Sequence, residues 1–92
     1  MNSTIFVVDD DEAMRDALAQ LLEAAGLQVE THACGPDFLA AYAESRPGCV
    51  LLDMAMPGMT GLEVQAELKA RGLAIPILFL TGHGDIPMAV RA

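Results

Sequence analysis

The sequence is poor in aromatic and basic residues. It has no tryptophan, one tyrosine and three phenylalanines, and its five lysines and arginines face thirteen acidic residues, for a net charge of −8. Proteins that bind nucleic acids neutralise phosphates with clustered Lys and Arg, so we expect no direct binding of DNA or RNA by these 92 residues. A cation or a basic protein surface is the expected partner.

Long apolar runs and cysteine pairs are also missing. No apolar run approaches the roughly 20 residues that a membrane-spanning helix needs, and the start MNSTIFVVDDD lacks the parts of a secretory signal. Cys34 and Cys49 have no CxxC or metal-ligand spacing. We expect them to be small buried apolar groups in a reducing compartment. These absences favour a cytosolic protein that does not enter a membrane.

Apolar segments alternate with helical patterns along the chain, and hydrophobic residues make up 53% of it. Strands are expected at 4–9, 27–32, 49–53 and 75–80. Helices are expected from the acidic run to Gly26, from Pro36 through Tyr42, and around 62–68 with a stop near Gly72, with a fourth starting at Pro87. This order predicts an α/β fold, in which a parallel sheet is covered by helices on both faces.

Acidic residues follow two of the predicted strands. Asp9, Asp10 and Asp11 come after the first, and Asp53 ends the third. Ligands of open α/β sheets bind at the carboxyl ends of the strands, and strands that are neighbours lie about 4.8 Å apart. If the first and third strands are adjacent, the carboxylates converge into an all-oxygen site that suits Mg²⁺ or Mn²⁺ rather than zinc.

Such a site also suits phosphoryl transfer, because an aspartate is already ionised at neutral pH and can act as the nucleophile. Thr81 ends the fourth strand, where its hydroxyl could donate to a phosphoryl oxygen. Purely structural readings stay open: the acidic run could charge a helix N-terminus, and Asp53 could be a turn residue. His83 is expected in a loop and His32 at the surface.

Three motifs together resemble the receiver domains of bacterial two-component response regulators. They are VVDDDEAMRDAL, LLDMAMPGMTG with the pattern D-x-x-M-P-x-M-x-G, and ILFLTGHGDIPMAV, in that order along the whole chain. The third looks closest to regulators of the nodulation and nitrogen-fixation type. The resemblance implies a flavodoxin-like fold with strand order 2-1-3-4-5, here about four strands and three helices plus the start of a fourth helix.

The resemblance also implies roles for single residues. Asp53 would be the phosphoacceptor and Thr81 the switch hydroxyl. Asp9, Asp10 and Asp53 would bind Mg²⁺, with Mn²⁺ as a possible substitute, and the backbone carbonyl of Ala55 would complete the ligand set. Pro57 and Gly61 would shape the loop after the nucleophile. The chain would be a phosphoacceptor switch with autophosphatase chemistry of its own rather than a metabolic enzyme.

Receivers of this family end in a fifth strand with a lysine, and Lys69, the only lysine here, lies in the third predicted helix. We therefore expect residues 1–92 to form a single receiver domain that is incomplete at its C-terminus. The implied partners are a sensor histidine kinase, a helix-turn-helix output domain outside these residues, and a second copy upon phosphorylation.

Two alternatives remain. One is a receiver-shaped interaction module that is not phosphorylated. The other is a phosphatase of the haloacid-dehalogenase type, in which Asp9 would be the nucleophile and Asp11 the general acid. The second leaves the loop after Asp53 without a role.

Overall fold

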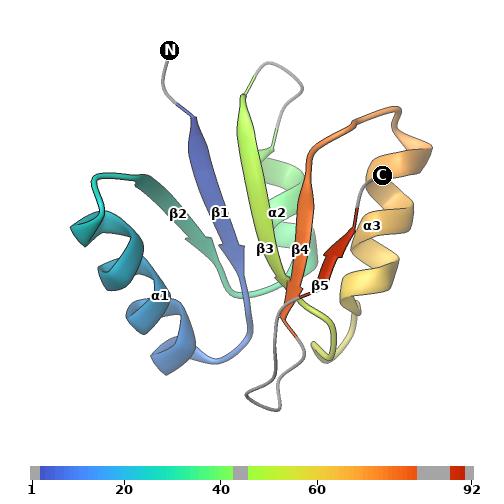
Figure 1. The fold of residues 1–92 in the computed structure, drawn as a ribbon. Coiled ribbons are helices and arrows are strands. Elements are labelled where there is room, and N and C mark those ends of the chain that lie inside the picture. Colours follow the sequence, from blue (N-terminus) through green and yellow to red (C-terminus); the bar gives the residue numbers. More distant parts are fainter. Residues whose placement is uncertain (1–2, 43–45, 81–87, 91–92) are drawn as a thin grey trace.

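A computed structural model describes residues 3–42, 46–80 and 88–90 of the chain (Figure 1). The strands and helices follow one another as β1 (Thr4–Val8), α1 (Glu12–Ala24), β2 (Gln28–His32), α2 (Gly35–Ala41), β3 (Gly48–Asp53), α3 (Gly61–Ala70), β4 (Ile77–Leu80) and β5 (Met88–Val90). The predicted alternation of strands and helices is therefore confirmed as far as β4.

The strands form one sheet in the order β2-β1-β3-β4-β5. The first four are parallel, and β1 lies between β2 and β3. Val8 is paired with Leu52, and Asp53 with Leu80, so β1, β3 and β4 end close together at one edge of the sheet. This confirms the flavodoxin-like order for the four parallel strands, and with it the adjacency that the predicted acidic site requires.

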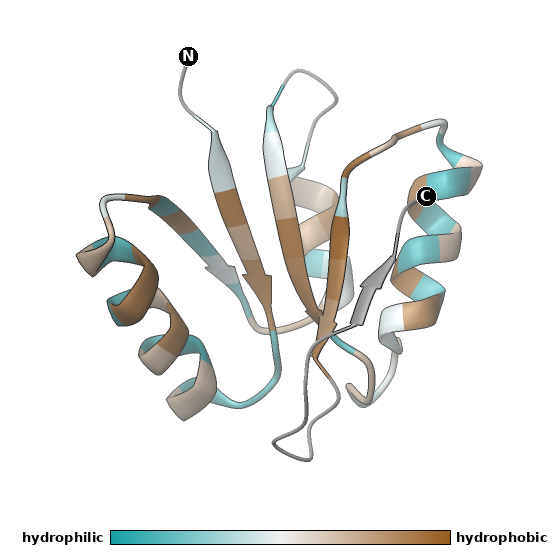
Figure 2. Cartoon of the chain, viewed as in Figure 1, coloured by the Kyte–Doolittle hydropathy of each residue, from teal (hydrophilic) through white to brown (hydrophobic). Residues whose placement is uncertain are grey.

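Helices lie on both faces of the sheet, but they cover the two faces unequally. Phe6 and Val8 of β1 point into a core that α2 and α3 complete with Phe38, Val64 and other apolar residues. Figure 2 shows the hydrophobic colouring concentrated in β1, β3 and β4. On the opposite face α1 has no fully buried residue, and its Leu21 is 67% exposed. The main hydrophobic core is therefore the one between the sheet and the α2–α3 layer.

The helix ends follow from local side-chain chemistry. The Asp11 carboxylate accepts hydrogen bonds from the first turn of α1, and Thr60 and Glu63 form a reciprocal capping box at the start of α3. Beyond the other ends of these helices, Gly26 and Gly72 have φ angles of 87° and 72°, which glycine adopts without strain. Both glycine stops are where the sequence predicts them.

The prediction of a fourth helix starting at Pro87 is wrong for residues 88–90, which the structure describes. Met88–Val90 form a short strand, β5, antiparallel to β4. The free edge of β4 offers unpaired backbone donors and acceptors to any nearby extended segment.

Two expectations for single side chains also need correction. His32 is not a surface residue: its side chain is 11% exposed, stacks near Phe6 and bonds Glu30. Arg46 joins this cluster, with two contacts to Glu30 and its guanidinium over the Phe6 ring. Cys34 and Cys49 are free thiols, as expected, but only partly buried. His32 ends β2 against the rings of Phe6 and Phe38, which cover it, whereas Cys34 precedes α2 and Cys49 lies near the amino end of β3, where the core covers them incompletely.

Within the described ranges, each helix is too short or too polar to cross a bilayer.

Candidate functional site

Asp53 ends β3 in the middle of the sheet and is only 7% exposed. Its Oδ1 accepts a hydrogen bond of 3.1 Å from the backbone N–H of Ala55. The next residue, Met54, donates its N–H to the carbonyl of Leu80, so β4 supports the chain just after Asp53. The carboxylate is therefore held in a defined orientation at the carboxyl edge of the sheet.

The loop after Asp53 is anchored at both sides. Met56 is 3% exposed and belongs to the core, while Gly61, the first residue of α3, donates its N–H to the carbonyl of Met54. A Cβ at Gly61 would lie 2.5 Å from the Asp53 carbonyl oxygen, a distance that no side chain tolerates. Gly61 therefore lets α3 start directly against the backbone of Asp53.

The three aspartates that follow β1 have two different roles. Asp11 caps α1, accepting from the N–H groups of Ala13 and Met14. Asp9 is 6% exposed, and its Oδ1 accepts from the N–H of Asp11 at 2.9 Å. Asp10 lies between them and is exposed. The helix-capping reading thus applies to Asp11, whereas the other two carboxylates face β3.

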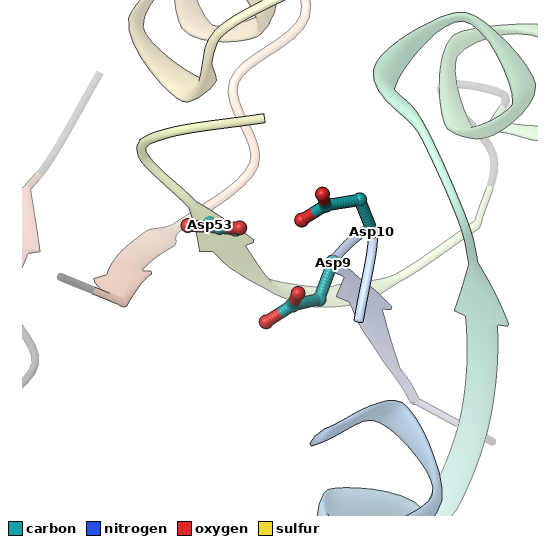
Figure 3. A group of neighbouring side chains, drawn as sticks. All are labelled: Asp9, Asp10 and Asp53. Carbon is teal, nitrogen blue, oxygen red and sulfur yellow. The ribbon is translucent and has the colours of Figure 1, made fainter. Parts of the chain in front are cut away.

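Carboxylate oxygens of Asp9, Asp10 and Asp53 all lie within 4.8 Å of one another. Figure 3 shows Asp9 and Asp10 beyond the end of β1 and Asp53 at the end of β3, with their carboxylates gathered in one place. Burial raises the pKa of Asp53 above its ordinary value, and the neighbouring Asp10 raises it further. The hydrogen bond from the Ala55 N–H lowers this pKa, but it does not cancel the increase. Burial, followed by the charge of Asp53, likewise raises the pKa of Asp9.

These residues fit a small divalent cation. The side-chain donors are all carboxylate oxygens, the ligands that Mg²⁺ prefers. These oxygens lie within 4.8 Å of one another, close enough that side-chain rotations would let them hold one cation together. Burial is the first cause of the raised pKa values of Asp9 and Asp53, and the charges of the neighbouring carboxylates raise them further, so a positive charge among these residues would be favourable.

The structure thus brings three of the predicted site residues together and leaves two predictions untested. Ala55 contacts Asp53 through its N–H, and the role of its carbonyl stays a prediction. Thr81 lies outside the described residues, although Leu80 before it is paired with Asp53. The sequence reading missed Arg15, whose guanidinium donates to the Asp9 carbonyl. A cation so near the N-terminus of a helix is unfavourable, and that is the sequence signal that could have singled it out.

A parallel α/β sheet with carboxylates clustered at its carboxyl edge defines a class of doubly wound proteins whose ligand site lies at that edge. Within this class, the chain belongs to the response regulator receiver domain family, whose model matches residues 5–92. Receiver domains are signalling switches that bind Mg²⁺ at an acidic pocket.

Individual relatives agree with this assignment. The chain is 49% identical over 90 residues to the response regulator protein TodT of Pseudomonas putida, covering 98% of this chain and 40% of TodT. It is 47% identical over 88 residues to the transcriptional regulatory protein FixJ of Azorhizobium caulinodans, covering 96% and 42%. The chain therefore spans less than half the length of these curated relatives. The match to FixJ confirms the predicted likeness to regulators of the nodulation and nitrogen-fixation type.

A solved structure shows the same likeness in three dimensions. The response regulator protein TrrA of Thermotoga maritima superimposes with a TM-score of 0.79 at 32% identity, covering 89% of this chain and 71% of TrrA. That structure is a complex with Mg²⁺ and BeF.

Proposed function

We propose that this chain accepts a phosphoryl group on Asp53, and the observation that carries the proposal is the placement of that carboxylate. Asp53 is buried at the end of a central strand, oriented by the Ala55 N–H, and shares its site with Asp9 and Asp10. The turn reading of Asp53 accounts for the Ala55 contact, but it gives no reason for placing two more acids beside a buried carboxylate.

The chemistry follows from this arrangement. A carboxylate oxygen of Asp53 attacks the phosphorus of a donor, the bond from phosphorus to the donor nitrogen breaks, and the nitrogen keeps its electron pair. A bound Mg²⁺ supplies charge neutralisation for the phosphoryl oxygens. Asp9, Asp10, Asp53 and the Ala55 carbonyl would hold that ion, and Mn²⁺ would fit the same oxygen set. Water later hydrolyses the acyl phosphate and restores Asp53.

The partners are inferred from the family. The donor would be a phosphohistidine of a sensor kinase, because relatives of this chain are response regulators. The output would be a helix-turn-helix domain outside these residues, since other relatives are transcriptional regulatory proteins. Thr81 would carry the phosphorylated state to that output or to a second copy. The cytosolic location, and the assignment of residues 1–92 to one domain incomplete at its C-terminus, stay predictions.

Phosphoryl uptake tests the proposal. The wild type is incubated with acetyl phosphate and Mg²⁺, and its intact mass is compared with that of Asp53→Asn, Asp9→Asn and Asp16→Asn. Asp16 is an exposed acid of α1 outside the group of three carboxylates, so its variant controls for the loss of one charge.

We expect a phosphoryl adduct on the wild type and on Asp16→Asn, and none on Asp53→Asn. An adduct that survives Asp53→Asn but disappears with Asp9→Asn would instead support the phosphatase alternative. Complete absence of an adduct from a folded, Mg²⁺-binding wild type would support the interaction module.

A further inference from the structure

Arg15 makes a contact that no step of the proposed reaction uses. It lies in the first part of α1, and its Nη1 donates a hydrogen bond of 2.7 Å to the backbone carbonyl of Asp9. Its own N–H donates to the Asp11 carbonyl at 3.0 Å. Arg15 therefore binds the acidic segment at two points, once through its backbone and once through its side chain.

These contacts complete the fixation of the segment between β1 and α1. The Asp9 N–H donates to the His32 carbonyl of β2, and the Asp9 carboxylate accepts from Asp11. The Asp9 carbonyl, the remaining polar group of that residue, is the one that Arg15 binds. This carbonyl belongs to the peptide that joins Asp9 to Asp10, so the Arg15 contact restrains the backbone from which the Asp10 carboxylate projects.

The position of Arg15 is unfavourable on other grounds. A cation near the positive end of a helix is disfavoured by the helix dipole, and ordering an arginine side chain costs rotamer entropy. Among the described residues, Arg15 is the cation that bonds to the acidic segment. Its hydrogen bond to Asp9 and the nearby negative charge offset these costs.

We propose that Arg15 is a positioning residue for the cation site, because its bond to the Asp9 carbonyl directs the carboxylates of Asp9 and Asp10 toward Asp53 before the ion binds. This inference rests on the proposed function, in which those three carboxylates hold Mg²⁺. Residues that orient metal ligands from behind typically contribute about 10- to 100-fold to metal affinity.

Positioning and simple charge predict opposite results for this residue. If Arg15 acted only as a positive charge near the site, its removal would strengthen the binding of Mg²⁺ by lowering the repulsion. If it positions the ligands, its removal weakens binding, despite the charge that is lost. The direction of the change in Mg²⁺ affinity therefore separates the two roles.

The test is a calorimetric titration of Mg²⁺ into the wild type, Arg15→Gln, Arg15→Lys and Arg71→Gln. Arg71 is the matched control: it also bonds a backbone carbonyl, that of Leu39, but it follows α3 at the end away from Asp53. Gln forms helices about as well as Arg and has a shorter, uncharged side chain. Circular dichroism in EDTA checks that each variant is folded.

We expect Arg15→Gln to bind Mg²⁺ about 10-fold more weakly than the wild type, Arg15→Lys to lie between them, and Arg71→Gln to equal the wild type. Unchanged or tighter binding by Arg15→Gln overturns the inference and leaves the proposed function intact. A folded wild type that binds no Mg²⁺ overturns both. Should Arg15→Gln fail to fold, Arg15→Lys decides: weaker binding than the wild type supports positioning, and equal or tighter binding refutes it.

Discussion

Replacing Asp53 by Asn should stabilise the fold when no divalent cation is present. The Asn side chain retains an oxygen that can accept the Ala55 N–H, so the main change is the loss of one negative charge beside Asp9 and Asp10. Proteins commonly hold such charges at functional sites at the expense of stability.

The magnitude follows from the distances. Two unit charges 4.8 Å apart repel by about 0.9 kcal/mol in water and by about 3.5 kcal/mol at an effective dielectric constant of about 20. Asp10 is exposed, which places its interaction near the lower figure, whereas Asp9 is buried. Summed over both neighbours, we therefore expect the free energy of unfolding to rise by about 2–4 kcal/mol, and the melting temperature by at least about 8 °C for a domain of this size.

The pH dependence has a defined sign. The pKa of Asp53 is raised in the folded protein, so this residue favours the folded state when it is protonated, and that contribution is lost as the pH rises through the folded pKa. The advantage of Asp53→Asn over the wild type should accordingly be full at neutral pH and should shrink as the pH falls below that pKa.

Thermal unfolding followed by circular dichroism in EDTA measures these effects, with Asp16→Asn as the control for the general loss of charge. Mg²⁺ should then stabilise the wild type more than Asp53→Asn, because the variant has lost a ligand. If Asp53→Asn were no more stable in EDTA than Asp16→Asn, the expected mutual repulsion of the three carboxylates would be refuted.

Three further substitutions test other parts of the structure. Gly61→Ala brings a Cβ to 2.5 Å from the Asp53 carbonyl oxygen and must displace the backbone there. Phosphoryl uptake, measured by mass spectrometry, should fall about 10-fold or more, as expected when a reacting group moves by about 1 Å. The control is Gly26→Ala, which is strained but lies in open space and should leave uptake unchanged. Gly48→Ala would place a Cβ 1.8 Å from the Thr4 carbonyl oxygen, so β1 and β3 must separate. We expect the free energy of unfolding, measured by chemical denaturation, to fall by more than about 2 kcal/mol. A denaturation midpoint near that of the wild type would contradict this close approach. Glu30→Gln removes the acid whose pKa is lowered below 4.5, chiefly by its hydrogen bonds to Arg46. The wild type should be more stable by up to about 1 kcal/mol at neutral pH and should lose that advantage as the pH falls through the folded pKa of Glu30; parallel stability curves for the two proteins would refute the pairing.

The sequence predicted the features that depend on local pattern or on chain order. The apolar segments of β1, β3 and β4 and the glycine stops at Gly26 and Gly72 are local signals, and they were enough to place the elements. Parallel strands must end at a common edge, so the residues that follow β1 and β3 could be expected to meet once those strands were taken as neighbours.

Contacts that depend on side-chain reach could not be predicted in this way. The bond from Arg15 to Asp9 spans six residues, and the pairing of Glu30 with Arg46 spans sixteen, and neither has a fixed sequence pattern. β5 was missed for a different reason: Met88–Val90 pair with an edge that β4 offers, so their conformation depends on a partner rather than on their own propensity.

The unequal packing of the two sheet faces has a consequence for motion. Helix α1 has no fully buried residue, so we expect its amides to exchange with solvent through local opening at a lower free energy than those of β1 or β3. Yet α1 carries Asp11 and Arg15, which hold the segment of Asp9 and Asp10. Each opening of the least packed helix would release two ligands of the cation site, and a bound cation would in turn slow hydrogen exchange along α1. The rate at which this helix detaches would then limit how long the acidic site stays assembled.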